Sequence, residues 1–437
     1  MRFHSLLGVT MVACGAACGY APQVCAAQRT NDPPRVLNVN VSVEPQARRV
    51  TIRFDIEDTE QDDMQVELRI AGNAAPFEIP PGAVLGDVGF PVRPGSRSIV
   101  WEYDPSGLDL SRPLRIKVVA DDIQPVDLQQ VVDAVDSARL ERDVETLQGV
   151  RHYSANRTNI LAAKDFIESQ FVANGVQSTR QAFSYSGWPA ENMIGTHSGE
   201  LDERAVYIVN GHFDTIASTP GADDNASGTA GMLEAMRVLS RYRFQKTIKF
   251  IGFDLEEVGI VGSRYYAQNI RDGERIEGLF NFEMIGYTCT TPACDAFRSV
   301  GNYIHNIGDP NSDVLRLGFD AAAAQFAPGL AVRSTQGDPS DTNLRRSDHI
   351  GFWDRGVRAL FFTDGANFRN PHYHRASDTA QTLNFDFMTG IVKATVATVA
   401  QFAEIRHLGV GVSEEFSIPD ATPVDRTRWG DVKGDYR

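Results

Sequence analysis

The sequence predicts an α/β domain preceded by an all-β segment, and two patterns carry this prediction. Between residues 36 and 120, short runs such as Val50, Ile52 and Phe54 alternate apolar with polar residues. This alternation is typical of strands with one buried face. From about residue 124, strand-like apolar runs alternate with helix-like runs, which indicates a sheet covered by helices on both faces.

Each predicted element follows from its local pattern. In the α/β part, the strands are expected at residues 205–209, 247–253, 276–285 and 359–362, and the helices at residues 134–147, 160–174, 227–242 and 258–270. In the β segment, the strand-like runs are separated by turns that contain Pro and Gly. Such a series looks like a fibronectin type III or immunoglobulin-like sandwich.

The N-terminus is typical of a secretion signal. Arg2 supplies a positive charge, Leu6–Ala17 is mostly apolar, and small residues allow cleavage near Ala27. We therefore expect a secreted or periplasmic protein, with lipid attachment at Cys14 or Cys18 as the less favoured alternative. The predicted organisation is a signal peptide at 1–27, a β-sandwich at 34–123, an α/β domain at 128–410 and a polar C-terminal tail at 411–437.

Composition narrows the possible partners. The formal net charge of the 437-residue chain is −15, which disfavours nucleic acid and anionic membranes as ligands. No segment is apolar and long enough to predict a membrane span. Once the signal peptide is removed, Cys289 and Cys294 remain, and an exported protein is expected to join them in a disulfide.

Short polar segments follow the predicted strands, at the edge where an open α/β sheet places its site. His212 and Asp214 come directly after the strand at 205–209, and in extended chain their side chains point the same way. His212 could bind a metal ion while Asp214 holds a nearby imidazole. Taken alone, such a pair is more typical of a plain polar turn.

Asp223 and Asp224 lie just before the predicted helix at 227–242. Helix capping is the alternative explanation for this segment, with Ser227 as the cap. Two adjacent aspartates exceed what a cap requires. A carboxylate at this position could span two metal ions.

Glu256 and Glu257 follow the apolar strand at 247–253. Adjacent carboxylates repel one another beside a buried sheet, and a cation would relieve that repulsion. One glutamate could then bind the metal while the other takes a proton. The alternative is the preference of helix N-termini for negative charge, worth about 0.3–1 kcal/mol.

Two further segments offer ligands. Glu283 lies in an apolar run, where an unpaired carboxylate is costly and needs a partner such as a metal ion. His372 and His374 lie in a predicted loop close to Asp378, and Ser347 begins another polar segment. Taken alone, the polar residues of either loop could simply be exposed at the surface.

The ordered series GHFD, GADDNASG, EEVGIVGS, NFEMIGY and HYHRASDT resembles the secreted zinc aminopeptidase and glutamate carboxypeptidase family, which includes bacterial leucyl aminopeptidases. The resemblance covers about residues 145–405 and leaves out the β segment. It implies a phosphorylase/hydrolase-like three-layer α/β/α zinc exopeptidase domain with two zinc ions per chain. It also implies peptide or protein substrates.

The resemblance assigns the metal ligands. One zinc ion would be held by His212 and Glu283, the other by Glu257 and His374, and Asp224 would bridge both. The family pattern places the bridging aspartate three residues before the serine of its Ser-Gly pair. It places the last histidine four residues before the aspartate of its Asp-Thr pair.

Two details of the resemblance concern single positions. Glu283 departs from the family, in which many members carry aspartate at this position. The family also has a cis peptide bond after the bridging aspartate, which here is the Asp224-Asn225 bond.

The expected chemistry is hydrolysis of a peptide bond by an activated water molecule. Two metal ions lower the pKa of that water, and Glu256, which remains unligated, takes its proton and later donates it to the leaving amine. Asp214 is the second catalytic residue, because it orients the histidine ligand.

The favoured activity is that of an aminopeptidase, and other possibilities stay open. A carboxypeptidase of the same family is the first. A glutaminyl-cyclase-like enzyme would use one zinc ion, whereas His212 with Asp214 favours two. A catalytically dead binding protein is disfavoured because every site position holds a competent residue. Cobalt or manganese would also suit these ligands.

Overall fold

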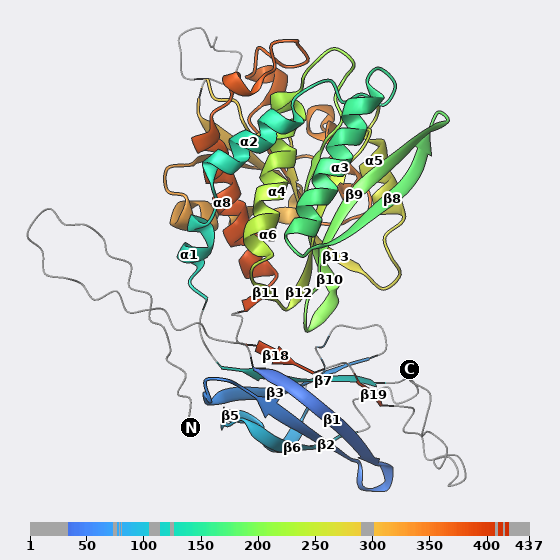
Figure 1. The fold of residues 1–437 in the computed structure, drawn as a ribbon, viewed down its shortest axis with the longest axis vertical. Coiled ribbons are helices and arrows are strands. Elements are labelled where there is room, and N and C mark those ends of the chain that lie inside the picture. Colours follow the sequence, from blue (N-terminus) through green and yellow to red (C-terminus); the bar gives the residue numbers. More distant parts are fainter. Residues whose placement is uncertain are drawn as a thin grey trace, which may run out of the picture. The chain divides into compact units, whose positions relative to one another are not determined.

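The computed structural model in Figure 1 describes residues 34–72, 77, 79, 81–104, 114–122, 126–289, 301–406, 410–413 and 416–418. The predicted signal peptide at residues 1–27 lies outside the described residues. So does Cys294, whereas Cys289 is described and is disulfide-bonded. Among the described residues, none of the helices combines the length and the apolar character needed to cross a membrane.

The N-terminal part consists of short antiparallel strands. They are β1 (Arg35–Glu44), β2 (Arg49–Glu57), β3 (Met64–Ala71), β4 (Ala83–Gly86), β5 (Gly89–Val92), β6 (Gly95–Glu102) and β7 (Leu114–Asp121). One sheet has the order β1-β2-β6-β4, and the other contains β7, β3 and β5. Side chains such as Ile52 and Trp101 from the first sheet share one apolar core with Val66 and Ile116 from the second. The alternating residues that predict strands are therefore the ones that are buried.

The second of these sheets is extended by the end of the described chain. Strands β18 (Val410–Val412) and β19 (Phe416–Ile418) both pair with β7 in antiparallel register. The sequence predicts a polar tail from residue 411, so the structure differs from the prediction here. The pairing was not visible in the local pattern because β7 lies almost 300 residues earlier in the chain.

The α/β part is built on a mixed sheet of eight strands. In spatial order they are β15 (Ala331–Gln336), β14 (Tyr303–Gly308), β16 (Ala359–Thr363), β13 (Arg275–Phe282), β10 (Asp202–His212), β12 (Lys246–Phe253), β9 (Trp188–His197) and β8 (Gln177–Tyr185). A separate short pair joins β11 (Arg243–Phe244) to β17 (Ile405–Arg406). The predicted strands at 205–209, 247–253, 276–285 and 359–362 correspond to β10, β12, β13 and β16.

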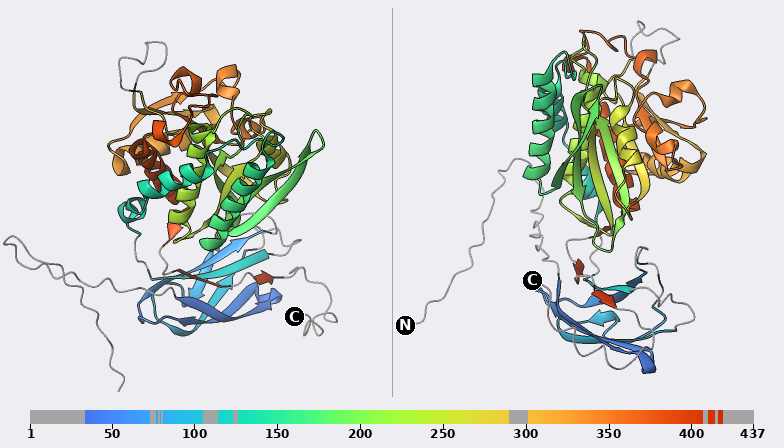
Figure 2. Two further views of the ribbon diagram at one scale, coloured as in Figure 1. Left: turned by 45° about the horizontal axis from the view of Figure 1, so that its top comes forward. Right: turned by 90° about the vertical axis from the view of Figure 1, so that its right-hand side faces the viewer.

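Eight α-helices are described. They are α1 (Leu128–Asp133), α2 (Ser137–Leu147), α3 (Arg157–Ala173), α4 (Gly228–Leu239), α5 (Val261–Gln268), α6 (Asp313–Phe326), α7 (Ile350–Trp353) and α8 (Phe385–Phe402). The sheet lies between two groups of these helices (Figure 2). Tyr207 and Val209 of β10 point into a core with α2, α4 and α8, whereas Val206 and Ile208 point into a core with α5 and α7. This arrangement confirms the predicted α/β sheet with helices on both faces.

The three central strands position the candidate site. β10 pairs in parallel with both β12 and β13, so their carboxyl ends lie at the same edge of the sheet. His212 is the register partner of Phe253, and Asn210 is the partner of Asn281. The polar segments that follow these strands in the sequence are therefore brought together in space.

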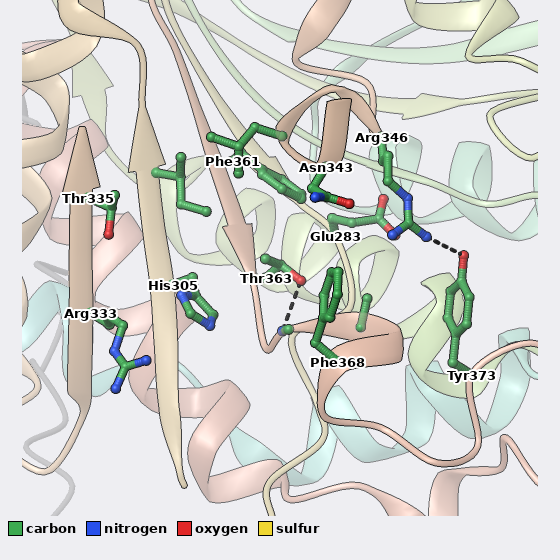
Figure 3. Close-up of a pocket in the computed structure, with 14 residues that line it drawn as sticks. Glu283, His305, Arg333, Thr335, Asn343, Arg346, Phe361, Thr363, Phe368 and Tyr373 are labelled. Carbon is green, nitrogen blue, oxygen red and sulfur yellow. Dashed lines mark hydrogen bonds between the residues drawn. The ribbon is translucent and has the colours of Figure 1, made fainter. Parts of the chain in front are cut away.

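A cavity of about 310 Å³ lies over the part of the sheet formed by β15, β14 and β16, and these three strands make its floor (Figure 3). Glu283, which follows β13, lines one side of this cavity. The cavity is therefore adjacent to the carboxyl ends of the central strands.

Candidate metal centre

The side chains predicted to form the site converge at the carboxyl edge of the sheet. His212 is the last residue of β10, Glu256 and Glu257 follow β12, and Glu283 follows β13. The segment Ala222–Ser227 adds Asp224 immediately before α4. His374 enters from the loop after β16, with a left-handed backbone at φ 57°.

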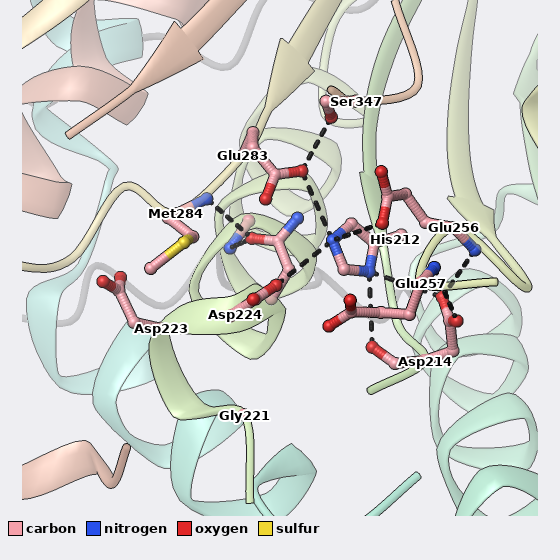
Figure 4. Close-up of polar contacts among 12 residues, drawn as sticks. His212, Asp214, Gly221, Asp223, Asp224, Glu256, Glu257, Glu283, Met284 and Ser347 are labelled. Atoms are coloured by element: carbon pink, nitrogen blue, oxygen red, sulfur yellow. Dashed lines mark hydrogen bonds and ion pairs between the residues drawn. The ribbon is translucent and has the colours of Figure 1, made fainter. Parts of the chain in front are cut away.

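The first group of ligand atoms surrounds Nε2 of His212, as Figure 4 shows. This nitrogen lies 3.3 Å from Oε2 of Glu283 and 3.5 Å from Oδ1 of Asp224. Oε2 of Glu256 is farther away, at 3.9 Å. The ligand atoms of His212, Asp224 and Glu283 lie within 4.8 Å of one another, close enough to be bound by one metal ion.

The second group shares Asp224 with the first. Nε2 of His374 lies 3.1 Å from Oδ2 of Asp224 and 3.2 Å from Oε2 of Glu257. These three residues also have ligand atoms within 4.8 Å of one another. Asp224 thus presents one carboxylate oxygen to each histidine.

The neighbouring candidates lie elsewhere. Asp223 points away from His212 (Figure 4) and accepts hydrogen bonds from the backbone N–H of Gly286 and from the side chain of Asn370. His372 contacts the hydroxyl of Ser377 at 2.9 Å. The geometry agrees with the preference for Asp224 and His374 that the family pattern indicates.

A close approach between backbones allows α4 to begin directly beside β10. A Cβ atom on Gly211 would lie 2.7 Å from the backbone of Gly228, so only glycine allows α4 to begin against β10. The Asp224-Asn225 peptide bond is cis, as the resemblance implies. The Asn225 side chain then accepts a hydrogen bond from Met284 N–H at 3.0 Å.

Asp214 links the histidine to both glutamates. Its two carboxylate oxygens accept hydrogen bonds from the backbone N–H groups of Glu256 and Glu257, at 3.0 and 3.1 Å. Oδ1 also lies 3.4 Å from Nδ1 of His212. The carboxylate therefore positions the loop that carries Glu256 as well as the imidazole ring.

Glu283 is held from behind by a chain of polar side chains. Ser347 donates to Glu283 at 2.7 Å, Asn281 donates to Ser347 at 2.8 Å, and Asn210 donates to Asn281 at 2.5 Å. The sequence indicates Ser347 as a polar loop residue near the site. Its contact with Glu283 appears only in three dimensions, because 64 residues separate the two.

Arg151 is the site-supporting residue that the sequence interpretation misses. Its guanidinium group is buried and donates to backbone carbonyls on both site loops, including Phe213 O at 2.5 Å and Gly221 O at 2.9 Å. It also donates to Pro220 O at 3.0 Å. No residue-type pattern could reveal this role, because every partner is a backbone atom.

A second support comes from Asp378. Its carboxylate accepts hydrogen bonds from the backbone N–H groups of Asp223, at 2.8 Å, and of Asp224, at 3.2 Å. In the sequence interpretation, Asp378 serves only to locate His374. The structure adds a direct contact with the segment that carries the shared ligand.

The electrostatics of the cluster favour bound cations. Burial raises the pKa of Glu256 well above its ordinary value, and burial together with Asp224 raises that of Glu257 to about 7. Burial opposes a charged histidine at position 374, yet Asp224 and Glu257 raise its pKa to about 10. Such mutual shifts mark a cluster with excess negative charge.

Unpartnered buried atoms test whether metal ions fit. Within the described part of the chain, Nε2 of His212, Nε2 of His374 and Oε1 of Glu257 have no hydrogen-bond partner. Buried polar atoms are normally paired, and imidazole nitrogens and carboxylate oxygens are the usual ligands of zinc. The residues present therefore fit the metal ions that the sequence predicts.

Comparison with known proteins identifies the domain. Residues 192–399 match Peptidase family M28. This segment is an M28 peptidase domain. It begins in β9 and ends in α8, so it contains both groups of ligand atoms and Glu256. The all-β segment lies outside it.

Relatives of the M28 domain carry related names. A probable zinc metalloprotease of Pyrenophora teres f. teres is 27% identical over 364 residues, which cover 70% of this chain and 74% of the relative. Aminopeptidase YwaD of Bacillus subtilis is 28% identical over 218 residues, covering 48% of this chain and 44% of YwaD.

Solved structures resemble the fold. LapB of Legionella pneumophila superposes with a TM-score of 0.54 at 16% identity, covering 78% of this chain and all of LapB (100%). An aminopeptidase from Aneurinibacillus sp. strain AM-1 superposes with a TM-score of 0.53 at 17% identity, covering 64% of this chain and 97% of that one. The M28 domain therefore has the fold of these proteins.

Proposed function

We propose that this protein is a zinc aminopeptidase that binds two zinc ions per chain and releases residues from the free N-terminus of peptides. The observation that supports this proposal most directly is the sharing of Asp224 between two groups of ligand atoms. One ion would be held by His212, Asp224 and Glu283, and the other by Asp224, Glu257 and His374. A carboxylate shared in this way is suited to two ions rather than one.

Glu256 is left without a ligand role and is the proposed general base. When bound, the two zinc ions supply Lewis acidity that polarises a peptide carbonyl and acidifies a water molecule. The Glu256 carboxylate takes a proton from water and later donates it to the amine that leaves. Its side chain is 10% exposed, so it is close to the ligands and still open to the site.

Asp214 acts through its neighbours in this proposal. Its carboxylate accepts hydrogen bonds from the backbone N–H groups of Glu256 and Glu257. It also lies beside Nδ1 of His212. Nε2 of the same ring is therefore directed at Asp224 and Glu283. Asp214 is a positioning residue, and its loss would disturb the base and the ligands together.

The choice of an aminopeptidase rests on the comparisons. Two of the proteins compared above, YwaD of Bacillus subtilis and the enzyme from Aneurinibacillus sp. strain AM-1, are named aminopeptidases. A carboxypeptidase with the same centre is the remaining alternative. A one-zinc enzyme would leave the group of Asp224, Glu257 and His374 without a function.

The decisive experiment measures metal content and end preference together. Purified protein should contain about two zinc ions per chain, and leucyl 4-nitroanilide should be cleaved whereas its N-acetylated form should not. Full activity in metal-free protein would overturn the zinc mechanism. Preference for N-blocked peptides with a free carboxyl end would replace the aminopeptidase by a carboxypeptidase.

Two further proposals concern the rest of the chain. We propose that residues 34–123 form a fibronectin type III or immunoglobulin-like sandwich, which the two antiparallel sheets with a common core support. We also propose that the protein is exported after removal of residues 1–27. The protein should be recovered outside the cytoplasm with an N-terminus near Gln28. Its confinement to the cytoplasm would contradict the export, and an N-terminus beginning at Met1 would contradict the removal of residues 1–27.

A further inference from the structure

The cavity beside Glu283 has a floor made by two rows of side chains from three strands (Figure 3). Strand register places Arg333 of β15, His305 of β14 and Thr363 of β16 side by side. The next row toward the carboxyl ends of β14 and β15 contains Thr335, Ile307 and Phe361. The cavity therefore runs from a carboxylate of the metal centre, over an apolar stretch, to an arginine on the edge strand.

The arginine at the outer end is held in place without being neutralised. The guanidinium of Arg333 stacks over the ring of Tyr303 at 4.2 Å. Within the described ranges, Arg333 forms no ion pair with a carboxylate. By contrast, Arg345 pairs with Asp354 at 2.7 Å. In a chain of net charge −15, an ordered arginine without a carboxylate is available for a ligand.

A second arginine lines the cavity nearer the metal centre. Arg346 donates to the side chain of Asn367 at 2.8 Å and to the hydroxyl of Tyr373 at 3.2 Å. Both partners are uncharged, and the described residues offer Arg346 no ion pair. The guanidinium thus adds a second positive charge to the cavity wall.

The pKa of His305 is lowered by burial and by the positive charges around the cavity. Burial, together with the positive charges of Arg369 and Arg333, lowers the pKa of this histidine to about 4. The ring is therefore neutral at physiological pH and lines the cavity as an uncharged polar group. Glu283 is the only carboxylate that lines the cavity among the described residues, and it belongs to the metal centre.

These observations together define a ligand class. We propose that the cavity receives a carboxylate of the peptide substrate, with Arg333 as its main counter-charge and Ile307 and Phe361 contacting the aliphatic part. A volume of about 310 Å³ suits a portion of one short substrate rather than a folded protein. This inference rests on the proposed aminopeptidase, because it names the substrates that the same site prefers.

The carboxylate can belong either to an acidic N-terminal side chain or to the free C-terminus of a dipeptide. Two pairs of substrates distinguish these sources. The side chain of an acidic N-terminal residue is tested by glutamyl against leucyl 4-nitroanilide. The free C-terminus of a dipeptide is tested by leucyl-leucine against leucyl-leucine amide. The wild-type protein is expected to prefer the carboxylate-bearing member of one pair, and that pair identifies the source.

The charge of Arg333 should account for this preference. Arg333→Gln is expected to lower the ratio of kcat/KM for the carboxylate-bearing substrate over its neutral partner by about tenfold, since hydrogen bonds to charged groups contribute on this scale. Arg333→Glu should reverse the preference. Arg355→Ala is the matched control, because Arg355 is exposed and does not line the cavity, and it should leave the ratio unchanged.

A binding measurement keeps this inference separate from the proposed activity. Zinc-loaded Glu256→Gln protein, which is not expected to cleave the dipeptides, should bind glutamate, or leucyl-leucine, about tenfold more tightly than glutamine, or leucyl-leucine amide, in calorimetric titration. Adding Arg333→Gln to the same protein should remove that difference. Equal affinity for the charged and neutral members of both pairs would overturn the carboxylate pocket, even if the wild-type protein cleaves leucyl 4-nitroanilide. Discrimination that persists unchanged in Arg333→Gln would equally overturn the role of Arg333.

Discussion

The hydroxyl group of Ser347 donates a 2.7 Å hydrogen bond to Oε2 of Glu283. The same oxygen lies 3.3 Å from Nε2 of His212, so the contact orients a proposed ligand whose stem is longer than that of aspartate. Ser347→Ala should weaken zinc binding by about 10–100-fold, the usual effect of losing such a contact. Competition with a chromophoric chelator measures this loss. Ser340→Ala alters an exposed serine and is the control; equal zinc affinity in both variants would refute the supporting role of Ser347.

Replacing the proposed base should separate chemistry from metal binding. Glu256→Gln keeps the size of the side chain and removes its ability to take a proton, so kcat should fall by about 10³-fold. Zinc content, measured by mass spectrometry of the metal, should remain that of the wild type. Glu257→Gln should instead lose zinc. Turnover near the wild-type rate in Glu256→Gln would exclude Glu256 as the base.

Removing the Arg151 guanidinium should destabilise the domain. Arg151→Leu would leave the carbonyls of Phe213, Pro220 and Gly221 without their buried donor. Each unpaired buried group costs about 1–3 kcal/mol, so the free energy of unfolding should drop by about 3 kcal/mol or more. Urea denaturation measures the change, with the exposed Arg355→Leu as control. A loss below about 1 kcal/mol in Arg151→Leu would show that water replaces these contacts.

His349 should make stability depend on pH. Burial lowers the pKa of His349 to about 3, from an ordinary value of 6.5, and the ring contacts Leu344 O at 2.7 Å. The unfolded chain therefore binds a proton that the folded one does not. Stability from the neutral ring is complete above pH 6.5 and is lost as the pH falls toward 3, at roughly 1.4 kcal/mol per pH unit.

The matching variant isolates this contribution. His349→Phe keeps an aromatic ring against Phe361, on which His349 stacks at 4.5 Å. Unfolding free energies of both proteins are measured between pH 5 and 6.5 with excess chelator, so that zinc release does not contribute. The wild type should show the steeper loss of stability on acidification. Parallel curves for the two proteins would assign the pH dependence to other groups.

The sequence indicates part of the proposed centre because three of its residues follow regular elements. His212, Glu256 and Glu283 each come at the end of an apolar strand, and adjacent parallel strands place those ends together. Asp224 and His374 lie in loops, where periodicity carries no information. Their choice over Asp223 and His372 depends on the family pattern rather than on physical reasoning.

The supports of the centre are less visible in the sequence for a physical reason. Arg151 binds backbone carbonyls, which every residue has, so its partners leave no trace in residue type. Arg333 becomes distinctive only once β14 and β15 are paired, since its lack of a carboxylate partner is a property of three-dimensional surroundings. Neither property is contained in a single segment of the sequence.

The pairing of β18 and β19 with β7 has a consequence for how the protein is made. During synthesis the N-terminal sheet is produced first, yet the edge of β7 has no partner until the ribosome reaches residues 410–418. Closing a contact over such a sequence separation is slow, and an open strand edge invites pairing with other chains. The nascent protein therefore carries an incomplete sheet throughout translation of the whole catalytic domain. Shortening the chain before residue 410 would make that exposed edge permanent.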